Sequence, residues 1–360
     1  MIKKTSKAPH PQSPVGNPFL TESTGKASQQ ARRVVRRWRR VLLISLAVVG
    51  AAVVVRGGGD RTLTIISYNV QNLFDGADDG GEYAGFRSQD GSTARRYWQR
   101  LDTLAGVLST IGAGRASVMV FSEAEHAGVV ADLTGDLVAG DWVVVSAGTP
   151  PFGTQVVVAL REPPRQVRVH AASVVRANGG GVTRQWRSRA AVACVIAGAH
   201  GRPLHIYAAH WKSQRGGREA TELYRALEAR LAAYVIERGD SPGLLVGDLN
   251  RDLYAPGGEL QFSLPDTRFW SEGGFATLWD ADSGPGSYWY NGAWQRLDHA
   301  YLYLPPGLAS GAPWDVSLTA AMPRALLDSA GLPYRYNPRT GSGVSDHLPL
   351  VITLARPRPR

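Results

Sequence analysis

From Leu63 to about Leu354 the chain alternates short apolar runs, rich in β-branched residues, with loops rich in Gly and Pro. Such runs, bounded by turn residues, are typical of strands. We predict strands over residues 63–68, 118–122, 142–146, 155–160, 167–175, 189–196, 204–210, 244–246, 299–303 and 350–354. Many strands with helices between them predict an α/β fold of two sheets with helices on their outer faces.

Two stretches have the 3.6-residue periodicity of an amphipathic helix, residues 97–111 and 219–238. The first predicts one apolar face made by Leu101, Leu104, Ala105, Leu108 and Ile111. The second predicts a face made by Leu223, Leu227, Leu231, Tyr234 and Val235. With neither a repeat nor a second linker in view, we expect residues 61–355 to form one domain.

The formal charge of +10 suggests a polyanion-binding protein, but it is unevenly distributed. Residues 1–60 hold 11 Lys/Arg and two acids, whereas residues 61–355 hold 26 Lys/Arg and 28 acids. Because affinity for nucleic acid comes mainly from phosphate neutralisation, a nearly neutral domain needs a local basic patch to bind it.

The N-terminal region has the composition of a disordered basic tail, residues 1–40, followed by an uncharged apolar run, residues 41–55. As a helix, 15 residues reach about 22 Å, which is short for a hydrocarbon core of about 30 Å. Three interpretations stay open: a buried soluble helix, a cleaved signal peptide, and an uncleaved anchor whose flanking arginines snorkel.

The anchor is the preferred interpretation. Six arginines abut the run, which disfavours a buried helix, and a basic region of about 40 residues is unusually long for a signal peptide. The positive-inside rule then keeps the tail in the cytoplasm and places everything after Arg56 outside it. We therefore expect a single-pass protein of the cell membrane with an extracytoplasmic domain, or a secreted domain if the segment is cleaved. Cys194 stands alone between apolar neighbours and predicts a small buried hydrophobe.

Polar residues gather where the predicted strands end, which is where loops place functional groups. The residues of interest are Asn69, Glu123, His210, Lys212, Asp248, Asn250, Asp298, Asp346 and His347. Taken singly, each is typical of a turn, a cap or a surface pair. Together they offer oxygen ligands for a hard cation, with Mg²⁺ favoured and Mn²⁺ or Ca²⁺ as alternatives, and two imidazoles for acid–base chemistry. Hydrolysis of a phosphate ester needs these groups.

These motifs, in order, are SYNVQNLFD (67–75), SE (122–123), HWKS (210–213), GDLN (247–250), RLDH (296–299) and SDH (345–347). The set resembles the endonuclease/exonuclease/phosphatase superfamily over the whole globular part. The resemblance implies a four-layered α/β sandwich, with two central mixed β-sheets that are flanked by helices and open onto one metal-bearing cleft.

The resemblance also implies roles for the motif residues. Glu123 would be the principal metal carboxylate, supported by Asn69, and Asp346 would complete the metal or phosphate site. Asp248 would polarise the attacking water or the leaving group, and Asn250 would hold the phosphate. On the two sides of that phosphate, His210 would stabilise the transition state and His347, oriented by Asp298, would act as acid or base. Glu125 is the less favoured ligand, since the family's carboxylate directly follows Ser122.

One departure separates the chain from abasic-site endonucleases, because residues 151–155 offer neither the Tyr nor the Arg that some members have there. The HWKS segment instead resembles the bacterial extracellular-nuclease-like branch. Lys212 is the only Lys after residue 26, so its compact ammonium could bind a substrate phosphate, with a plain surface role as the alternative.

Two further segments keep two interpretations each. Tyr288, Trp289, Tyr290 and Trp294 surround an Asn-Gly turn, which predicts a hairpin covering a sheet edge or, alternatively, a stacking platform for bases or a lipid-facing wedge. Arg184, Arg187 and Arg189 could contact phosphates or form a solvated strand edge.

The favoured function is a metal-dependent nuclease that acts on nucleic acid outside the cytoplasm. The alternatives are a phosphoesterase for lipid head groups or small phosphate esters, which a membrane tether favours, and a non-catalytic surface protein that keeps the fold. We expect a monomer whose contacts are its phosphate-ester substrate and, through residues 41–55, the membrane.

Overall fold

The computed structural model describes residues 62–87, 92–147, 153–178, 181–198, 202–252, 274–308 and 315–355. All of them belong to one unit of the chain, Gly57–Arg360. The predicted tail and anchor, residues 1–40 and 41–55, lie outside the described residues. Among those described, no helix is both long enough and apolar enough to cross a membrane.

Two six-stranded sheets form the centre of this unit. The first has the order β15-β16-β1-β2-β4-β3, with β1 (Leu63–Leu73), β2 (Val118–Ala124), β3 (Val143–Ser146), β4 (Gln155–Leu160), β15 (Asp315–Ala320) and β16 (Leu350–Ala355). The second has the order β11-β14-β10-β9-β8-β5, with β5 (Gln166–His170), β8 (Ala191–Ala197), β9 (Pro203–His210), β10 (Gly243–Asp248), β11 (Gly274–Thr277) and β14 (Asp298–Leu304). Both are mixed, because β1 and β2 run parallel, as do β9 and β10, while the other pairs are antiparallel.

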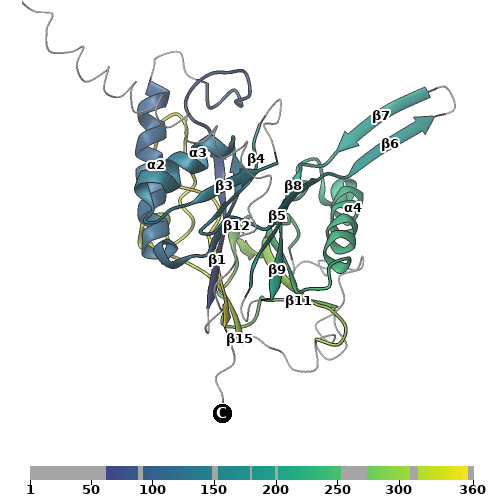
Figure 1. The fold of residues 1–360 in the computed structure, drawn as a ribbon. Helices are drawn as coiled ribbons and strands as arrows, with labels where there is room; N and C mark the ends of the chain where they lie inside the picture. Colours follow the sequence, from purple (N-terminus) through teal and green to yellow (C-terminus); the bar gives the residue numbers. More distant parts are fainter. Residues whose placement is uncertain are drawn as a thin grey trace, which may run out of the picture. The chain divides into compact units, whose positions relative to one another are not determined.

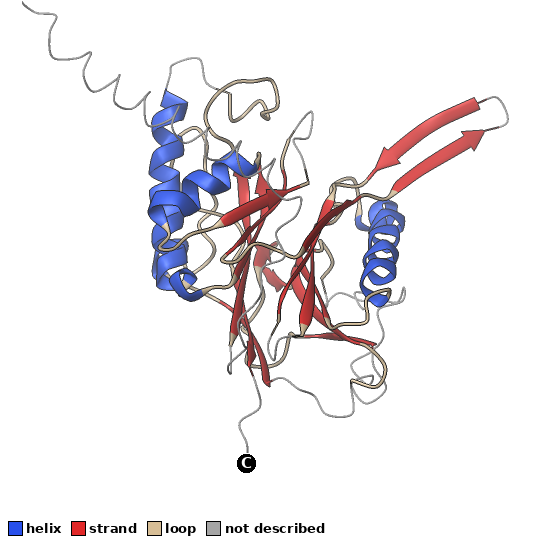
Figure 2. Ribbon diagram, viewed as in Figure 1, coloured by secondary structure: helices blue, strands red, loops and turns tan. Residues whose placement is uncertain are grey.

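Helices cover the outer faces of the two sheets, as Figures 1 and 2 show. On the first sheet lie α2 (Ser92–Thr110) and α3 (Ala127–Asp132), and a π-helical turn (Leu133–Leu137) continues α3. On the second sheet lies α4 (Arg218–Glu237). Short 3₁₀ turns span Ala113–Arg115 and Arg324–Leu326. The predicted four-layered α/β sandwich is confirmed.

The two cores follow from these layers. One apolar cluster joins the facing sides of the sheets and includes Val120, Val158, Val246 and Ile352, all fully buried. A second cluster fills the space between the second sheet and α4, around Trp211 and Phe275. Cys194 is a free, buried thiol of the first cluster, as predicted, and burial raises its pKa to about 12.

The predicted strand over residues 167–175 is wrong as a single strand. The chain breaks at residues 171–172 into β5 and β6 (Ser173–Asn178), and β6 pairs with β7 (Gly181–Arg187) in a separate hairpin. The β-branched run hid this break, because residues 173–175 continue the strand pattern of β5. The strand predicted over 189–196 accordingly begins at Ala191. Four described elements, α3, β7, β11 and β15, are absent from the predicted set.

The predicted apolar face of the second helix is also wrong. In α4 the predicted Leu223 and Tyr234 are 49% and 58% exposed, and the buried face is instead built from Ala226, Ala229, Ala232, Ala233 and Ile236. Small side chains allow the helix to lie close to the sheet. The same face buries Arg225 and Glu228, which bond to the loop after β9. The face predicted for α2 is confirmed, with Leu101, Leu104 and Leu108 fully buried.

Candidate active site

The predicted site residues lie at one edge of the sandwich because of the parallel strand pairs. Asn69 and Glu123 come from the carboxyl ends of β1 and β2, and His210 and Asp248 from those of β9 and β10. The carboxyl ends of parallel strands share one edge of a sheet, and the register pairs Asp248 directly with His210. The antiparallel neighbour β14 starts at this edge, with Asp298 opposite Asp248.

The ends of β1 and β2 are irregular, and this irregularity aims their side chains. The register shifts between Asn69 and Leu73 on β1 and between Phe121 and Ala124 on β2. Glu123 has a φ of 63° and Asn72 a φ of 56°, in the left-handed region that non-glycine residues rarely adopt. The backbone N–H of Asn72 then donates to Oε2 of Glu123 at 2.9 Å. Bulges next to a site that re-aim a side chain are a recurrent device, and here they turn Glu123 toward the facing sheet.

Three side chains meet where the two sheets face each other. Nε2 of His210 lies 3.9 Å from Oε1 of Glu123 and 3.6 Å from Oδ2 of Asp248, and one ligand atom of each residue lies within 4.8 Å of the others. Burial, together with the charges of Asp298 and Glu123, raises the pKa of Asp248 to about 7. Burial and the charge of Asp346 also raise the pKa of Glu123. Carboxylates this close, with Asp248 buried and Glu123 half-buried, repel one another, which makes the cluster a fitting place for a cation.

Asn69 and Asn250 hold Asp248 in place from two sides. Nδ2 of Asn69 donates to Oδ2 of Asp248 at 2.9 Å, and the backbone N–H of Asn250 donates to Oδ1 of the same carboxylate at 2.9 Å. The amide oxygen of Asn69 accepts from the backbone N–H of Gln71, so this side chain positions Asp248. Nδ2 of Asn250 donates to the carbonyl of Trp211 at 3.2 Å, which fixes this side chain at the end of β10, where its backbone has a φ of 52°.

His347 and Asp298 form a buried pair across from this cluster. Nδ1 of His347 lies 2.7 Å from Oδ2 of Asp298, and Nε2 lies 4.0 Å from Oδ2 of Asp248. Burial alone would lower the pKa of His347, but the charge of Asp298 and its hydrogen bond raise it to about 10. The imidazole is therefore cationic at neutral pH, and its Nε2 carries a proton toward the centre of the site.

His210 is the opposite case. It is buried, and burial together with the charges of Arg189 and His347 lowers its pKa well below the usual value. A neutral imidazole thus faces a cationic one across Asp248. Two titratable groups of one type whose surroundings separate their pKa values are characteristic of acid–base sites.

Lys212 and Asp346 lie at the margins of the site. The backbone N–H of Lys212 donates to Oε2 of Glu228, and its Nζ donates to the carbonyl of Ser213 at 3.4 Å. The Asp346 carboxylate lies 2.7 Å from Nη2 of Arg335 and does not belong to the group of three ligands around Asp248. Its role as a metal ligand, and that of Lys212 in binding phosphate, stay predictions.

The predicted aromatic hairpin is confirmed as β12 (Tyr288–Tyr290) and β13 (Ala293–Gln295), with Asn291 at a φ of 49° in its turn. The ring of Tyr288 packs 4.7 Å from that of His347, and its hydroxyl accepts a hydrogen bond from Arg335. Tyr290 is 53% exposed. The hairpin therefore covers the His347 side of the site.

The sequence patterns give no role to Arg100 and Gln71. The buried guanidinium of Arg100 donates to the carbonyls of Val70, Gln71, Asn72 and Val344, so it joins the end of β1 to the loop before His347. Gln71 joins the same two segments, because its side chain exchanges two hydrogen bonds with the backbone of Tyr336. A signal for Arg100 was present, since it lies one turn before Leu104 on the apolar face of α2.

A sequence profile described as "Endonuclease/Exonuclease/phosphatase family" matches residues 64–356. No curated protein matches the sequence. Among solved structures, TDP2 from Caenorhabditis elegans is 13% identical, with 82% of this chain and 74% of that chain covered and a TM-score of 0.48.

Two further solved structures are similar to the same degree. D. rerio TDP2 complexed with a single-strand DNA product is 14% identical, covering 82% of this chain and 99% of that chain at a TM-score of 0.48. An endonuclease/exonuclease/phosphatase family protein from Bacteroides thetaiotaomicron is 13% identical, covering 83% and 97% at a TM-score of 0.48.

Proposed function

Because the chain belongs to the endonuclease/exonuclease/phosphatase family, we propose that it is a divalent-metal-dependent phosphodiesterase that hydrolyses nucleic acid outside the cytoplasm. The observation that carries this proposal is the meeting of Glu123, His210 and Asp248 with the His347–Asp298 pair at one edge. Cation ligands, a water-polarising carboxylate and an imidazolium are the groups that a phosphodiester displacement needs.

The residues at this edge fit a hard divalent cation. Glu123 and Asp248 are oxygen donors whose mutual repulsion a cation would relieve, and Mg²⁺ commonly uses one or two carboxylates. Glu123 would hold the ion, with Asn69 and Asp346 as the predicted supporting groups and Mn²⁺ or Ca²⁺ as alternative ions. When bound, the ion would neutralise charge on the phosphate oxygens.

The chain's own side chains then divide the remaining work. Asp248, fixed by Asn69 and Asn250, accepts the proton of the attacking water. His347 donates a hydrogen bond from Nε2 to a phosphate oxygen as negative charge develops there, and Asp298 keeps that imidazole protonated and oriented. His210, neutral and on the opposite side, faces the same phosphate. Asn250 and Lys212 position the phosphate group.

The test is cleavage of plasmid DNA by the full-length chain with Mg²⁺, compared with the same reaction in EDTA. We expect nicked and linear DNA only with the metal. Intact DNA under both conditions, with a folded protein, would contradict the nuclease proposal. A matched assay with RNA separates the two nucleic acids.

One sequence feature favours a second function. The apolar run over residues 41–55 and the six arginines before it would tether the domain to a membrane, where lipid head groups are the nearest phosphodiesters. We propose this tether, with the domain on the extracytoplasmic side, on the sequence alone. Release of phosphocholine from sphingomyelin vesicles, or of phosphate from small esters, with DNA left intact would replace the nuclease proposal by this one. Membrane fractionation of cells that express the full-length chain tests the tether.

A further inference from the structure

The charged residues of the domain predicted over residues 61–355 are unevenly distributed along the sequence, although its net charge is nearly zero. Residues 163–218 hold ten Lys/Arg and not one Asp or Glu, whereas the rest of 61–355 holds 16 Lys/Arg and 28 acids. Nine of the ten are Arg, whose planar guanidinium matches phosphate oxygens better than an ammonium does. The local basic patch that binding of a polynucleotide would need is therefore present in the sequence, concealed by the total.

The topology places much of this segment next to the catalytic residues. Strand β5 is antiparallel to β8, and β8 is antiparallel to β9, so β5 and β9 end at the same edge, at His170 and His210. We call this edge of the second sheet, which also carries Asp248, the catalytic edge. The β6–β7 hairpin is inserted between β5 and β8, and it therefore starts and finishes at that edge. In Figure 1 the hairpin projects from the sheet beyond its edge.

Side chains at the foot of the hairpin connect it to the site. Nη1 of Arg189 donates to the carbonyl of Trp211, the residue directly after His210, at 3.1 Å. Arg187, at the end of β7, is exposed. The loop after β9 carries exposed Arg215, and the neighbouring Gln214 donates to the carbonyl of Asn250 at 3.0 Å. Arg187 at the hairpin foot and Arg215 after β9 thus both belong to the edge of the second sheet that carries His210.

The first sheet presents the opposite charge at the same edge. Residues 75–82, in the loop directly after β1, include Asp75, Asp78, Asp79 and Glu82 and no Lys or Arg, and Arg87 of the same loop pairs with Asp78 alone among these four acids, at 3.7 Å. Glu125 and His126 follow β2 beside this loop, with Nε2 of His126 3.4 Å from Oδ2 of Asp75. A chain of phosphates would be repelled on this side and attracted on the other.

We infer that the catalytic edge of the second sheet, from the foot of the β6–β7 hairpin (Arg187, Arg189) to the loop after β9 (Arg215), binds the phosphates of a polynucleotide that flank the scissile one. This inference rests on the proposed function, and it assigns the substrate class: a polynucleotide of several phosphates, lying over the second sheet. A membrane surface is the weaker partner. At the hairpin foot the one large aromatic that the structure describes, Trp186, packs against Tyr224 at 4.4 Å between ring centroids and so is not a free lipid-facing wedge.

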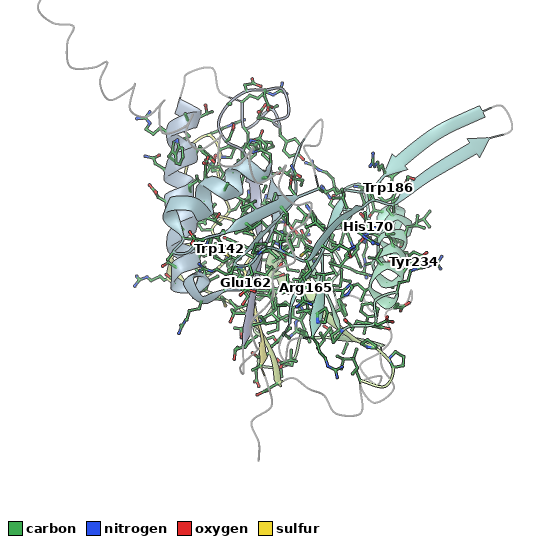
Figure 3. The ribbon with its side chains drawn as sticks, viewed as in Figure 1. Trp142, Glu162, Arg165, His170, Trp186 and Tyr234 are labelled. Carbon is green, nitrogen blue, oxygen red and sulfur yellow. The ribbon has the colours of Figure 1, made fainter. Side chains whose placement is uncertain are left out.

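The chain offers a matched control for a charge substitution. Arg165 and Arg202 belong to the same acid-free segment and are also exposed, but they precede β5 and β9 and therefore lie at the opposite edge of the sheet. Figure 3 shows the labelled Arg165 far from Trp186 and His170, which lie near the foot of the hairpin. Comparing the doubles Arg187→Gln/Arg215→Gln and Arg165→Gln/Arg202→Gln keeps the net charge equal and changes only the edge.

The experiment measures binding of a fluorescein-labelled 30-nucleotide single-stranded DNA in EDTA by anisotropy, and hydrolysis of the same DNA and of bis(4-nitrophenyl) phosphate with Mg²⁺. We expect the catalytic-edge double to weaken DNA binding about tenfold near physiological salt and to lower the slope of log Kd against log salt by about 1.4, for two lost phosphate contacts on a single strand. Its kcat/KM for the small diester should equal that of wild type. The opposite-edge double should match wild type in every assay.

Each other outcome is decisive. If the two doubles weaken DNA binding equally, net charge alone determines the affinity. If the catalytic-edge double binds DNA as wild type does, this edge does not bind DNA. Either result overturns the inference and leaves the proposed function intact. Unchanged DNA binding with lost binding to phosphatidylserine vesicles would assign the edge to a membrane and overturn it too. A wild-type chain that binds DNA through this edge but hydrolyses neither substrate would contradict the proposed function alone.

Discussion

Nδ1 of His347 lies 2.7 Å from Oδ2 of Asp298, and both side chains are buried. Asp298 is itself fixed, because its backbone N–H donates to Oγ of Ser287 and its carbonyl accepts from Nε1 of Trp279. The imidazole is therefore held in one orientation with its other nitrogen toward Asp248. A rigid acid–base group of this kind is worth more to a reaction than the same residue on a mobile loop.

Replacing this pair should remove turnover and leave the fold intact. We expect His347→Ala to lower kcat about 10²- to 10⁴-fold, the usual contribution of a positioned acid–base group. Asp298→Asn should act through the imidazole, since an amide does not hold the proton on Nδ1 as a carboxylate does. Steady-state kinetics on DNA, with circular dichroism to follow folding, measures both effects.

Tyr290→Ala is the control for that experiment, because Tyr290 lies in the same hairpin as Tyr288 but is exposed. It should keep wild-type kcat. A fully active His347→Ala enzyme would exclude His347 from the reaction.

Metal binding should depend on Glu123 and not on Glu125, two residues along the chain. Mg²⁺ that binds the folded state raises Tm by mass action. We expect this rise in the wild-type chain and its loss in Glu123→Gln, whose Tm without metal should stay equal or increase because one of two neighbouring, mutually repelling charges is removed. Differential scanning calorimetry with and without Mg²⁺ measures it. If Glu125→Gln lost the rise and Glu123→Gln kept it, the two assignments would have to be exchanged.

Arg100 should affect activity indirectly, because it holds the end of β1 against the loop before His347. Its guanidinium donates to four carbonyls around Asn69 and the loop before His347, so its loss leaves buried acceptors unpaired at about 1–3 kcal/mol each. We expect Arg100→Gln to weaken Mg²⁺ binding and to lower kcat more than it raises KM. Arg100→Lys should restore part of the stability but little of kcat, because one ammonium cannot reproduce the fork.

The matched control for Arg100 is Arg96→Gln, one turn earlier on α2, whose guanidinium reaches only the carbonyl of Pro338 among the bonds that the structure gives it. Kinetics and isothermal titration of Mg²⁺ on all three variants separate positioning from stability. Parallel losses of kcat and Tm in Arg100→Lys and Arg100→Gln would reduce Arg100 to a structural role.

A structural feature could be predicted from the sequence where neighbouring residues mark it, and could not where it depends on contacts between distant segments. Strand ends are marked locally, by a polar residue after an apolar run, so Asn69, Glu123, His210 and Asp248 stand out in the sequence alone, and the parallel pairing brings them together. Arg100 could not be given a role, because its four acceptors come from segments that meet only in the fold. The buried face of α4 could not be predicted for a related reason. Packing against the sheet buries the alanines and Arg225 of this helix, whereas the spacing of its leucines indicates a different face.

Glu228 offers a test on stability that is independent of catalysis. Its carboxylate is buried between α4 and the loop after β9, where it accepts from the backbone N–H of Lys212 at 2.8 Å. Burial raises its pKa to about 8, although that hydrogen bond and the charges of Arg189, Arg225 and Lys212 favour the ionised form. The folded state therefore holds a proton that the unfolded state, with an ordinary glutamate pKa, has lost. The stability that the folded state gains from keeping Glu228 protonated is fully present below pH 4.5 and is lost as the pH rises through about 8.

Glu228→Gln should consequently be more stable than wild type at pH 8–9, by up to a few kcal/mol since one pKa unit is worth about 1.4 kcal/mol, and the difference should shrink toward pH 5. Glutamine keeps an oxygen for the Lys212 N–H and carries no charge to bury. Urea unfolding from pH 5 to pH 9 measures the difference, with the exposed Glu219→Gln of the same helix as the control expected to follow wild type. Stability curves of Glu228→Gln and wild type that run parallel across this range would mean that Glu228 is already ionised in the folded protein at pH 5.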